Sequence, residues 1–433
     1  MKKKVLSLVL VAAMAASMVA CGSNDAATND ANATAPETQA ATNDAPAADA
    51  EEEIDYGSGE ITIWVADAVT DLTKQLADQF IADGGYNYTV TVEAVGEGDA
   101  AGNMITDVEG GADIYGFAQD QIARLVSAGA LQQLTGTGYD EWIAANNDNG
   151  ATGAATVGDI TYAFPMTSDN GYFLYYDKSV VTDPTSLEAI VADCEAAGKN
   201  FYFEINSGWY QTAFFFGTGC ELTYDTDNDG NFTACNISYA SDAGVVALNE
   251  IVELASSSAF QNGSSLSSAT NVGAIVDGTW DSAAAQEVFG DNYACAKLPE
   301  FEGSDGNKYQ LGGFGGFKLL GVKPQTEAGK LQVCLMLAQY LTSYDAQMAR
   351  FESNGWGPSN VEAQGSDAVK ADPALSALAE QLNYAIPQGN YPGDYWTLAT
   401  SLGDDVISGN VTADSDLMAT LQTFSDTCAS YAQ

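Results

Sequence analysis

The sequence predicts an α/β fold in which a mostly parallel sheet is covered by helices on both faces. Short β-rich runs alternate with segments that carry apolar residues at helical spacing, which is the pattern of βα units. Apolar residues make up 46% of the chain and aromatic residues 10%, so a large core can form. The length of 433 residues predicts two or three domains, or one large bilobal unit.

The predicted elements follow in order from local patterns. Residues 61–65 alternate and are β-rich, which predicts a first strand. Leu72, Leu76 and Phe80 recur at helical spacing before a double glycine, which predicts a first helix at 71–81. The same reasoning predicts further strands at 88–92, 112–117, 171–176, 201–205, 272–276 and 317–322, and a hairpin at 223–233. It predicts further helices at 99–108, 121–128, 186–197, 208–216, 243–255, 326–342, 345–353, 374–384, 394–408 and 415–430.

The balance of charges excludes several functions. The chain has 59 acidic and 14 basic residues, a net charge of −45, and no histidine. A strongly negative surface repels polyanions, so nucleic acids and anionic membrane surfaces are excluded as partners. Without histidine there is no Ser–His–Asp triad, no Cys–His pair and no histidine-ligated metal. We expect no cofactor.

The first 20 residues predict a lipoprotein signal peptide. Three lysines precede an apolar run at 5–19 that is too short to span a bilayer. Ala20 is followed directly by Cys21, which predicts cleavage between them and a lipid on the Cys21 thiol. An ordinary signal peptide with an incidental cysteine is the alternative, since Met18 stands where such signals usually carry leucine. Removal of the leader changes the net charge to 11 − 59 = −48.

Residues 21–58 predict a lipidated cysteine followed by a disordered acidic tether. Up to about residue 53 the segment contains no aromatic residue and no Leu, Ile or Val, so it cannot bury enough apolar surface to become ordered. We expect this tether to hold the folded body at the outer face of the cytoplasmic membrane, anchored through the lipid alone.

Six further cysteines and one acidic turn are the candidates for a metal site, and neither has the full pattern of one. No C-x-x-C pattern occurs, which disfavours a zinc ribbon and a thioredoxin-like motif. Cys220 and Cys235 flank the predicted hairpin, and they either form a disulfide across it or remain small buried residues. The segment 225–230 resembles the start of a calcium loop, but its twelfth position is Asn236 rather than glutamate, so an acidic hairpin turn is the alternative.

Several stretches of the folded body share their motifs with one known family. They are ITIWV at 61–65, GADI at 111–114 with FAQD at 117–120, YAFP at 162–165 with YYDK at 175–178, VDGTW at 276–280, NGWGPS at 354–359, and the segment 387–396. In these stretches the chain resembles the extracytoplasmic solute-binding proteins of ABC importers, in the maltose/maltodextrin-binding group. The resemblance runs from about residue 59 to residue 433.

This resemblance implies a two-lobed periplasmic-binding-protein fold, type II-like, with a ligand cleft between the lobes and a hinge that the chain crosses more than once. The glycines at 312–316 suit such a crossing and lack the spacing of a phosphate-binding loop. Closure of the lobes would bury the ligand. The expected ranges are 59–166 plus 313–370 for the N-lobe, 171–311 plus 376–433 for the C-lobe, and 165–170, 311–316 and 370–376 for the crossings.

The resemblance also implies a function. The chain would be the substrate-binding component of an ABC carbohydrate importer. It would capture maltose or maltodextrin at the cell surface and deliver it to the transmembrane subunits of the permease, as a monomer and without catalysis. Another neutral oligosaccharide, such as a xylo- or galacto-oligosaccharide, is the alternative ligand. A tethered glycoside hydrolase is the alternative activity, since 59 acidic residues allow a catalytic carboxylate pair.

The binding site of a neutral sugar needs aromatic platforms for the apolar ring faces and carboxylates or amides for the hydroxyls. By resemblance, Trp280 at a strand end, Trp396 at a helix start and Trp209 form these platforms, with Tyr210 as the rival of Trp209. A place in the core is the alternative for each tryptophan. The remaining tryptophans, Trp356 among them, are expected to be structural.

Four further residues are expected at the ligand by the same resemblance. Phe117 and Asp120 fall in a loop whose family pattern is an aromatic residue followed by an aspartate. Asp169 lies on the first crossing, where Asn170 is the alternative match, and Asp67 follows the first strand. Two cations of the family pattern, an arginine beside Asp120 and a lysine near Asp67, have no counterpart here. For each acid, a helix cap or a solvated loop position is the alternative.

Overall fold

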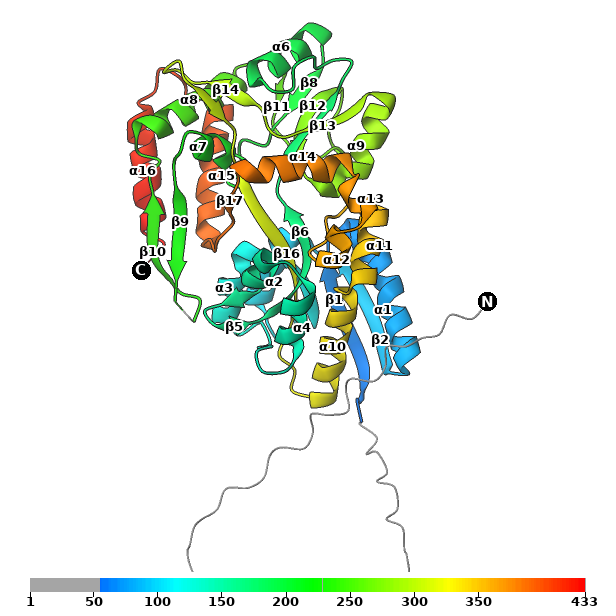
Figure 1. The fold of residues 1–433 in the computed structure, drawn as a ribbon. Helices are drawn as coiled ribbons and strands as arrows, with labels where there is room; N and C mark the ends of the chain where they lie inside the picture. Colours follow the sequence, from blue (N-terminus) through cyan, green and yellow to red (C-terminus); the bar gives the residue numbers. More distant parts are fainter. Residues whose placement is uncertain (1–54, 228, 433) are drawn as a thin grey trace, which may run out of the picture. The chain divides into compact units, whose positions relative to one another are not determined.

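The computed structural model describes residues 55–227 and 229–432, which form two α/β lobes (Figure 1). Each lobe is built around its own β-sheet. The predicted signal peptide, the lipid site at Cys21 and most of the predicted tether lie outside the described residues. In the part of the chain that the structure describes, no helix is both long enough and apolar enough to cross a bilayer.

The first lobe contains a six-stranded sheet with the order β17-β16-β3-β1-β2, in which β6 also pairs with β16. Strand β1 pairs in parallel with β2 and β3, whereas β16 runs antiparallel to β3 and β6. Ile61, Ile63 and Val65 alternate along β1 and are fully buried, which explains the period of two in the sequence. The strands are β1 (Ser58–Val65), β2 (Asn87–Ala94), β3 (Ile114–Ala118), β6 (Ala163–Asn170), β16 (Phe314–Val322) and β17 (Ile386–Pro387).

Helices cover both faces of this first sheet. Ile114 and Leu320 face the apolar cluster formed with α1 and α10, whereas their neighbours Tyr115 and Leu319 face the cluster formed with α2 and α3. Helix α1 ends where Gly85 adopts a left-handed conformation with φ of 66°. The helices are η1 (Asp67–Val69), α1 (Thr70–Gly84), α2 (Glu97–Thr106), η2 (Gln119–Gln121), α3 (Ile122–Ser127), α4 (Tyr139–Asn146), α5 (Asn149–Ala154), α10 (Ala328–Leu341), α11 (Tyr344–Asn354), α12 (Val361–Gln364) and α13 (Asp367–Lys370).

The second lobe contains a five-stranded sheet with the order β11-β8-β12-β7-β13. Strand β12 is buried along its whole length, because Val276 packs into one apolar cluster and Ile275 into the other. The strands are β7 (Phe173–Asp177), β8 (Asn200–Tyr202), β11 (Phe260–Gln261), β12 (Val272–Asp277) and β13 (Tyr293–Ala296). The helices are α6 (Leu187–Ala197), α7 (Thr212–Gly217), α8 (Asp242–Ala255), η3 (Thr279–Asp281), α9 (Ser282–Phe289), η4 (Gly290–Asn292), α14 (Pro373–Gln381), η5 (Leu382–Tyr384), α15 (Gly393–Ile407) and α16 (Leu417–Ala429).

Short hairpins lie outside the two large sheets. They are β4 (Thr156–Val157) with β5 (Ile160–Thr161), β9 (Leu222–Thr226) with β10 (Phe232–Ile237), and β14 (Glu300–Glu302) with β15 (Lys308–Gln310). The turn between β9 and β10 is closed by Asp227, whose carboxylate accepts hydrogen bonds from the backbone N–H groups of Asp229 and Asn231. Among the described residues, no group of three or more Cys, Asp or Glu side chains is placed to hold a metal ion.

The chain passes between the lobes more than once, as the family resemblance implies. Strand β6 ends in the first sheet at Asn170, and β7 begins in the second sheet at Phe173. The chain returns between β15 and β16 and crosses again between α13 and α14. Strand β17 then pairs with the start of β16 before α15 packs into the second lobe. The paired strands β6 and β16 run through the middle of Figure 1, where the lobes meet.

Two sequence predictions about elements were wrong. Both sheets are mixed rather than mostly parallel, because β6 leads into the hinge, β7 and β16 follow hinge crossings, and all three make antiparallel pairs. The helix predicted at 208–216 begins only at Thr212, since the Gln211 amide donates to the carbonyls of Ile205 and Ala399 and fixes an irregular turn. Of the two alternatives left open for Cys220 and Cys235, the structure has the one without a disulfide, since both cysteines are free.

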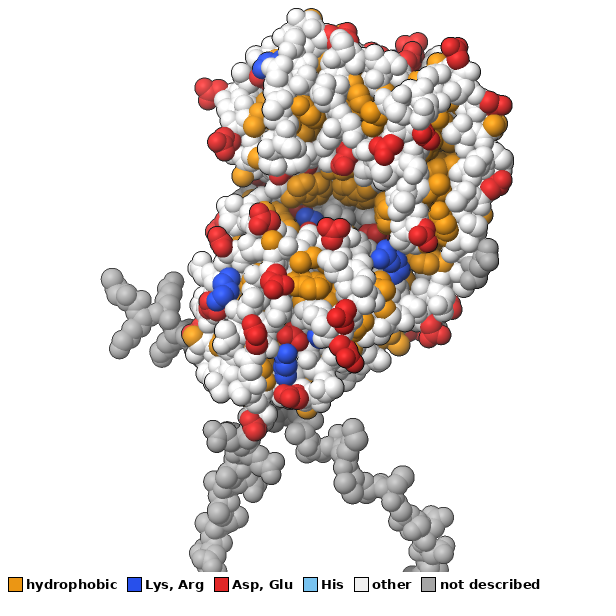
Figure 2. All heavy atoms as spheres, turned by 180° about the vertical axis from the view of Figure 1, so that it is seen from behind, with side chains coloured by type: hydrophobic (Ala, Val, Ile, Leu, Met, Phe, Trp, Pro, Cys, Tyr) orange, Lys and Arg blue, Asp and Glu red, His pale blue; other side chains and the backbone are white. Residues whose placement is uncertain are grey.

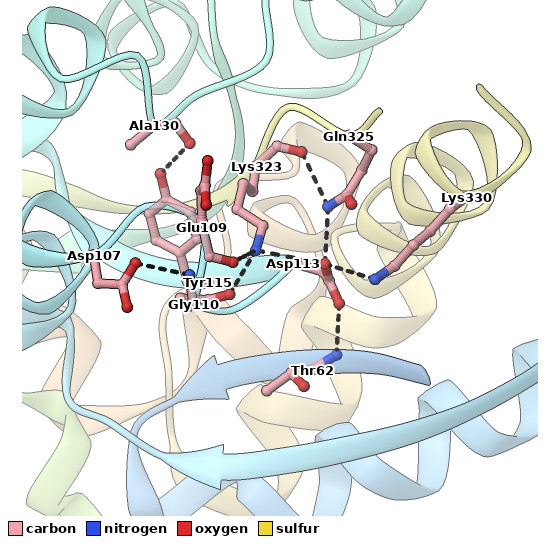
Figure 3. A network of polar contacts seen from close by, with 11 residues as sticks. Thr62, Asp107, Glu109, Gly110, Asp113, Tyr115, Ala130, Lys323, Gln325 and Lys330 are labelled. Carbon is pink, nitrogen blue, oxygen red and sulfur yellow. Dashed lines mark hydrogen bonds and ion pairs between the residues drawn. The ribbon is translucent and has the colours of Figure 1, made fainter. Parts of the chain in front are cut away.

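The aspartate of the GADI motif connects several elements of the first lobe. Asp113 is 5% exposed and accepts hydrogen bonds from the Thr62 N–H at 3.0 Å and the Gln325 amide at 2.9 Å. Its carboxylate also pairs with Lys330 at 2.9 Å (Figure 3). This paired and hydrogen-bonded charge joins β1, β3 and the loop after β16.

Candidate functional site

A cavity of about 470 Å³ lies between the two lobes. Figure 2 shows the hollow between them from behind, with apolar side chains along it and basic atoms inside it. Elements of the first lobe, the hinge and the second lobe all contribute to its walls. The lining residues are Ala66, Ala68, Glu97, Gly98, Ala118, Asp120, Gln121, Asn170, Trp209, Trp280, Asp281, Lys318, Trp356, Gln388 and Trp396.

The structure brings all three tryptophans of the sequence analysis to this cavity. The ring centroids of Trp209 and Trp280 are 5.8 Å apart with their planes inclined at 44°, so the two indoles form adjoining walls. Trp396 lies in the first turn of α15 and packs beside Tyr391 and Tyr395 at 5.4 and 4.8 Å. Each of the three indoles is partly exposed, whereas a core tryptophan would be buried.

Trp280 is held by the turn that follows β12. A Cβ at Gly278 would lie 2.0–2.3 Å from ring atoms of Trp280, so a larger residue here would force the indole out of its present position. The Tyr175 hydroxyl donates to the Gly278 carbonyl at 3.0 Å, and the Thr279 hydroxyl donates to the Asp169 carboxylate at 2.5 Å. Because Asp169 belongs to β6, residues of both lobes fix this turn.

Trp209 is fixed both at its backbone and at its indole nitrogen. Its carbonyl accepts a hydrogen bond from the Tyr172 hydroxyl at 3.0 Å, and the Tyr172 ring meets the indole edge-on at 4.7 Å. Its Nε1 donates to Oε1 of Gln388 at 3.1 Å. The rival residue Tyr210 is 5% exposed and packs into the core of the second lobe, away from the cavity.

Gln388 connects the two lobes in the wall of the cavity. Its Oε1 accepts hydrogen bonds from Trp209 and, at 3.2 Å, from the Asn170 amide, while its Nε2 donates to Asp120 at 2.8 Å. The side chain is 2% exposed. The sequence analysis included the segment 387–396 but did not single out Gln388, because an isolated glutamine in a loop carries no periodicity signal.

The acid Asp120 lines the cavity from the first lobe. Its side chain is 2% exposed, and this burial raises the pKa of the carboxyl to about 7, against the opposing charge of Arg124. Near neutral pH the carboxyl is therefore divided between an ionised form that only accepts hydrogen bonds and a protonated form that also donates.

Asp169 is buried beside the cavity and does not line it. It is 1% exposed, and its Oδ2 accepts hydrogen bonds from Thr279 of the second lobe and from the Gly357 N–H of the first. Through these contacts Asp169 connects the two lobes. The neighbouring Asn170 lines the cavity, which favours the alternative match on this crossing.

Phe117 is placed differently from the expectation, whereas Asp67 lies at the edge of the cavity. Strand β3 continues to Ala118, so the Phe117 side chain points into the core and is fully buried. A side chain without exposed surface cannot stack on a ligand, and the assignment of Phe117 is corrected accordingly. Asp67 is exposed in η1, between the lining residues Ala66 and Ala68.

Four lining residues that carry charge or an aromatic ring were missed by the sequence analysis. Glu97 is the first residue of α2 and Asp281 directly precedes α9. At such positions an acidic residue is normally interpreted as a helix cap. Trp356, expected to be structural, is 1% exposed in the core of the first lobe and still reaches the cavity. Lys318 lies within the apolar strand β16. A single charged residue in an apolar strand is a sequence signal that could have identified it as a functional residue.

The family of the chain follows from comparison with known proteins. A model of the bacterial extracellular solute-binding proteins matches residues 75–377, which are 303 of the 433 residues. The chain belongs to this family. Membership implies an extracytoplasmic location, and it confirms the resemblance drawn from the motifs.

Solved structures of other proteins share this fold. A structure solved with acarbose is 27% identical, and the match covers 87% of this chain and 100% of that chain with a TM-score of 0.77. The maltodextrin-binding protein MalE1 from L. casei BL23 is 21% identical, with 86% and 99% covered and a TM-score of 0.70. The maltotriose-binding protein of Thermus thermophilus, bound with maltotriose, is 18% identical, with 86% and 100% covered and a TM-score of 0.71.

These similarities confirm the two-lobed periplasmic-binding-protein fold of this solute-binding protein. A search of curated protein sequences gave no match.

Proposed function

We propose that this solute-binding protein is the substrate-binding component of an ABC carbohydrate importer, which captures maltodextrins and delivers them to the transmembrane subunits of a permease. The observation that carries the proposal is the cavity between the lobes, where Trp209, Trp280 and Trp396 surround carboxylate and amide groups. Indole rings stack on the apolar faces of sugar rings, and carboxylates accept hydrogen bonds from their hydroxyls.

The size of the cavity supports a small oligosaccharide. Its volume of about 470 Å³ falls within the range of roughly 300–1,000 Å³ that is usual for small-molecule sites. The choice of an α-glucan is supported by the names of the structural neighbours, which bind maltodextrin, maltotriose or acarbose. Asp120 and Asn170 are proposed to contact hydroxyls inside the cavity, and Asp67 at its edge.

The arrangement of the chain in the cell envelope is part of the same proposal. Residues 1–20 are proposed to be a cleaved signal peptide, Cys21 to carry the lipid, and residues 21–58 to tether the monomer to the outer face of the cytoplasmic membrane. The proposed lobes are those expected from the sequence, 59–166 plus 313–370 and 171–311 plus 376–433, except that β17 of the last range pairs into the first sheet. An extracytoplasmic location of the family agrees with a secreted and anchored protein.

Titration with maltotriose under tryptophan excitation tests the proposal. Three of the six tryptophans are proposed to stack on the sugar, so we expect saturable quenching of the fluorescence. A second assay measures reducing ends after prolonged incubation with maltotetraose. Unchanged reducing ends are expected of a binding protein, whereas turnover would favour a glycoside hydrolase and contradict the proposal.

A further inference from the structure

Lys318 places a buried positive charge in the wall of the cavity. It lies on β16 and is 5% exposed. Its Nζ is 4.0 Å from the ring centroid of Trp356, which follows α11 in the first lobe. It is 4.9 Å from the ring centroid of Trp280, which follows β12 in the second lobe. The ammonium group is thus attracted to the faces of two indoles that line the same cavity.

The ammonium group has unused hydrogen-bonding capacity. Within residues 55–227 and 229–432, the ion pairs involve Lys74, Lys323 and Lys330, and no hydrogen bond or ion pair of the Lys318 Nζ is found. An ammonium group carries three donors, and buried polar groups normally have partners. The indole faces attract the ammonium charge, but they do not provide conventional hydrogen-bond acceptors for its three N–H groups. A further acceptor at this point is therefore favoured.

Apart from the indole N–H of Trp356, which has no partner among the described residues, the polar groups around Lys318 are mostly acceptors or are already paired. Glu97, Asp120 and Asp281 bring carboxylates to the cavity. The amide of Asn170 is engaged with Gln388, and the amide of Gln388 is engaged with Asp120. A sugar hydroxyl accepts as well as donates, so a site of this kind needs a strong donor.

We propose that the Lys318 ammonium, held between the indoles of Trp280 and Trp356, donates a charge-assisted hydrogen bond to a hydroxyl of the bound oligosaccharide. This inference rests on the proposed function. The Lys318 ammonium would take the place of the arginine that the family pattern has beside Asp120, where this chain has Gln121. The three carboxylates disfavour an anionic sugar, so the substrate class is a neutral oligosaccharide.

The test compares the affinity of wild type, Lys318→Met and Lys74→Met for maltotriose by calorimetry. Methionine keeps the length and the apolar stem of Lys318 but removes the charge and the donors. We expect Lys318→Met to weaken binding about 10- to 100-fold, the range of a hydrogen bond to a charged group. Lys74 is an exposed lysine on α1, and its substitution is expected to change affinity less than about twofold.

A second comparison distinguishes a contact with the ligand from a merely structural role. Monodeoxy maltose analogues, each without one hydroxyl, are titrated into wild type and Lys318→Met. For the analogue that lacks the accepting hydroxyl, the two proteins are expected to bind equally, because the interaction is already absent. Lys318→Gln serves in the same cycle if the methionine variant does not show the circular dichroism of the folded wild type.

The outcomes separate this inference from the proposed function. Equal maltotriose affinity of wild type and Lys318→Met overturns the inference alone, and so does a loss that is the same for every deoxy analogue. Failure of the wild type to bind any neutral oligosaccharide overturns the proposed function, and the inference with it.

Discussion

At the scale of single residues, Asp120 couples the cavity to pH. Its carboxyl is buried, and its pKa is raised from 3.8 to about 7 because burial disfavours the charged form. The folded state therefore holds a proton that the unfolded state releases near pH 4. The stability that this group contributes is fully present below pH 4, and it is lost as the pH rises toward 7.

We expect Asp120→Asn to remove this pH dependence. The asparagine oxygen can still accept from Gln388, so the fold is kept. Relative to wild type, the variant gains stability as pH rises from 4 to 8, by on the order of 4 kcal/mol, because the pKa of Asp120 is about 7 in the folded protein and 3.8 without burial. Urea denaturation of both proteins at several pH values measures the difference in their free energies of unfolding. Other buried acids titrate in both proteins, so their contribution cancels in this difference. A difference that is the same at pH 4 and pH 8 would contradict the assignment.

The candidate site was only partly predictable at this scale. Trp280 and Trp396 were found because a strand end and a helix start combine with family motifs. Phe117 was assigned wrongly, since one further residue of strand β3 turns its side chain into the core. Gln388 and Lys318 were missed because their roles depend on contacts between residues that are distant in sequence.

At the scale of elements, the β9–β10 hairpin meets the first lobe at its turn. Gly230 has a φ of +83°, and a Cβ there would lie 2.1 Å from the carbonyl oxygen of Ala123 and 2.9 Å from its carbonyl carbon. Ala123 belongs to α3 of the first lobe. Because a backbone atom rather than a flexible side chain fills this space, the hairpin turn and α3 are in direct backbone contact.

We expect Gly230→Ala to destabilise the protein more than Gly306→Ala. Gly306 lies in the β14–β15 turn with a similar φ of +79°, but nothing lies within 4 Å of its added Cβ. Both variants have the cost of a left-handed alanine, about 1–2 kcal/mol, and only Gly230→Ala adds a clash, typically about 1–3 kcal/mol more. Denaturation midpoints measure both. Equal losses would show that the hairpin turn does not rest on α3.

The elements themselves were largely predictable from periodicity. Helices α1, α8 and α16 overlap their predicted ranges because their apolar residues recur at helical spacing. The antiparallel pairing of β6 and β16 was not predictable, because it depends on how the chain returns through the hinge. The turn that carries Trp209 was predicted as a helix, since local sequence does not reveal that Gln211 bonds to α15.

At the scale of the whole molecule, the large negative charge agrees with a neutral ligand. The chain has 59 acidic and 14 basic residues, and ion pairs among the described residues engage only Asp78 and Asp113 of these acids. Acidic side chains are spread over the face shown in Figure 2. Such a surface keeps the protein soluble and repels anions, but it does not oppose the approach of an uncharged sugar.

Calorimetric titration with a panel of neutral oligosaccharides tests the central claim most directly. The panel contains maltose, maltotriose and maltotetraose, with xylo- and galacto-oligosaccharides of the same lengths. Since the proposed site is the cavity between the lobes, we predict saturable heat with the α-glucans at one ligand per protein. Heat with another glycan but with no α-glucan would contradict the assigned substrate, and no heat with any glycan would contradict sugar binding itself.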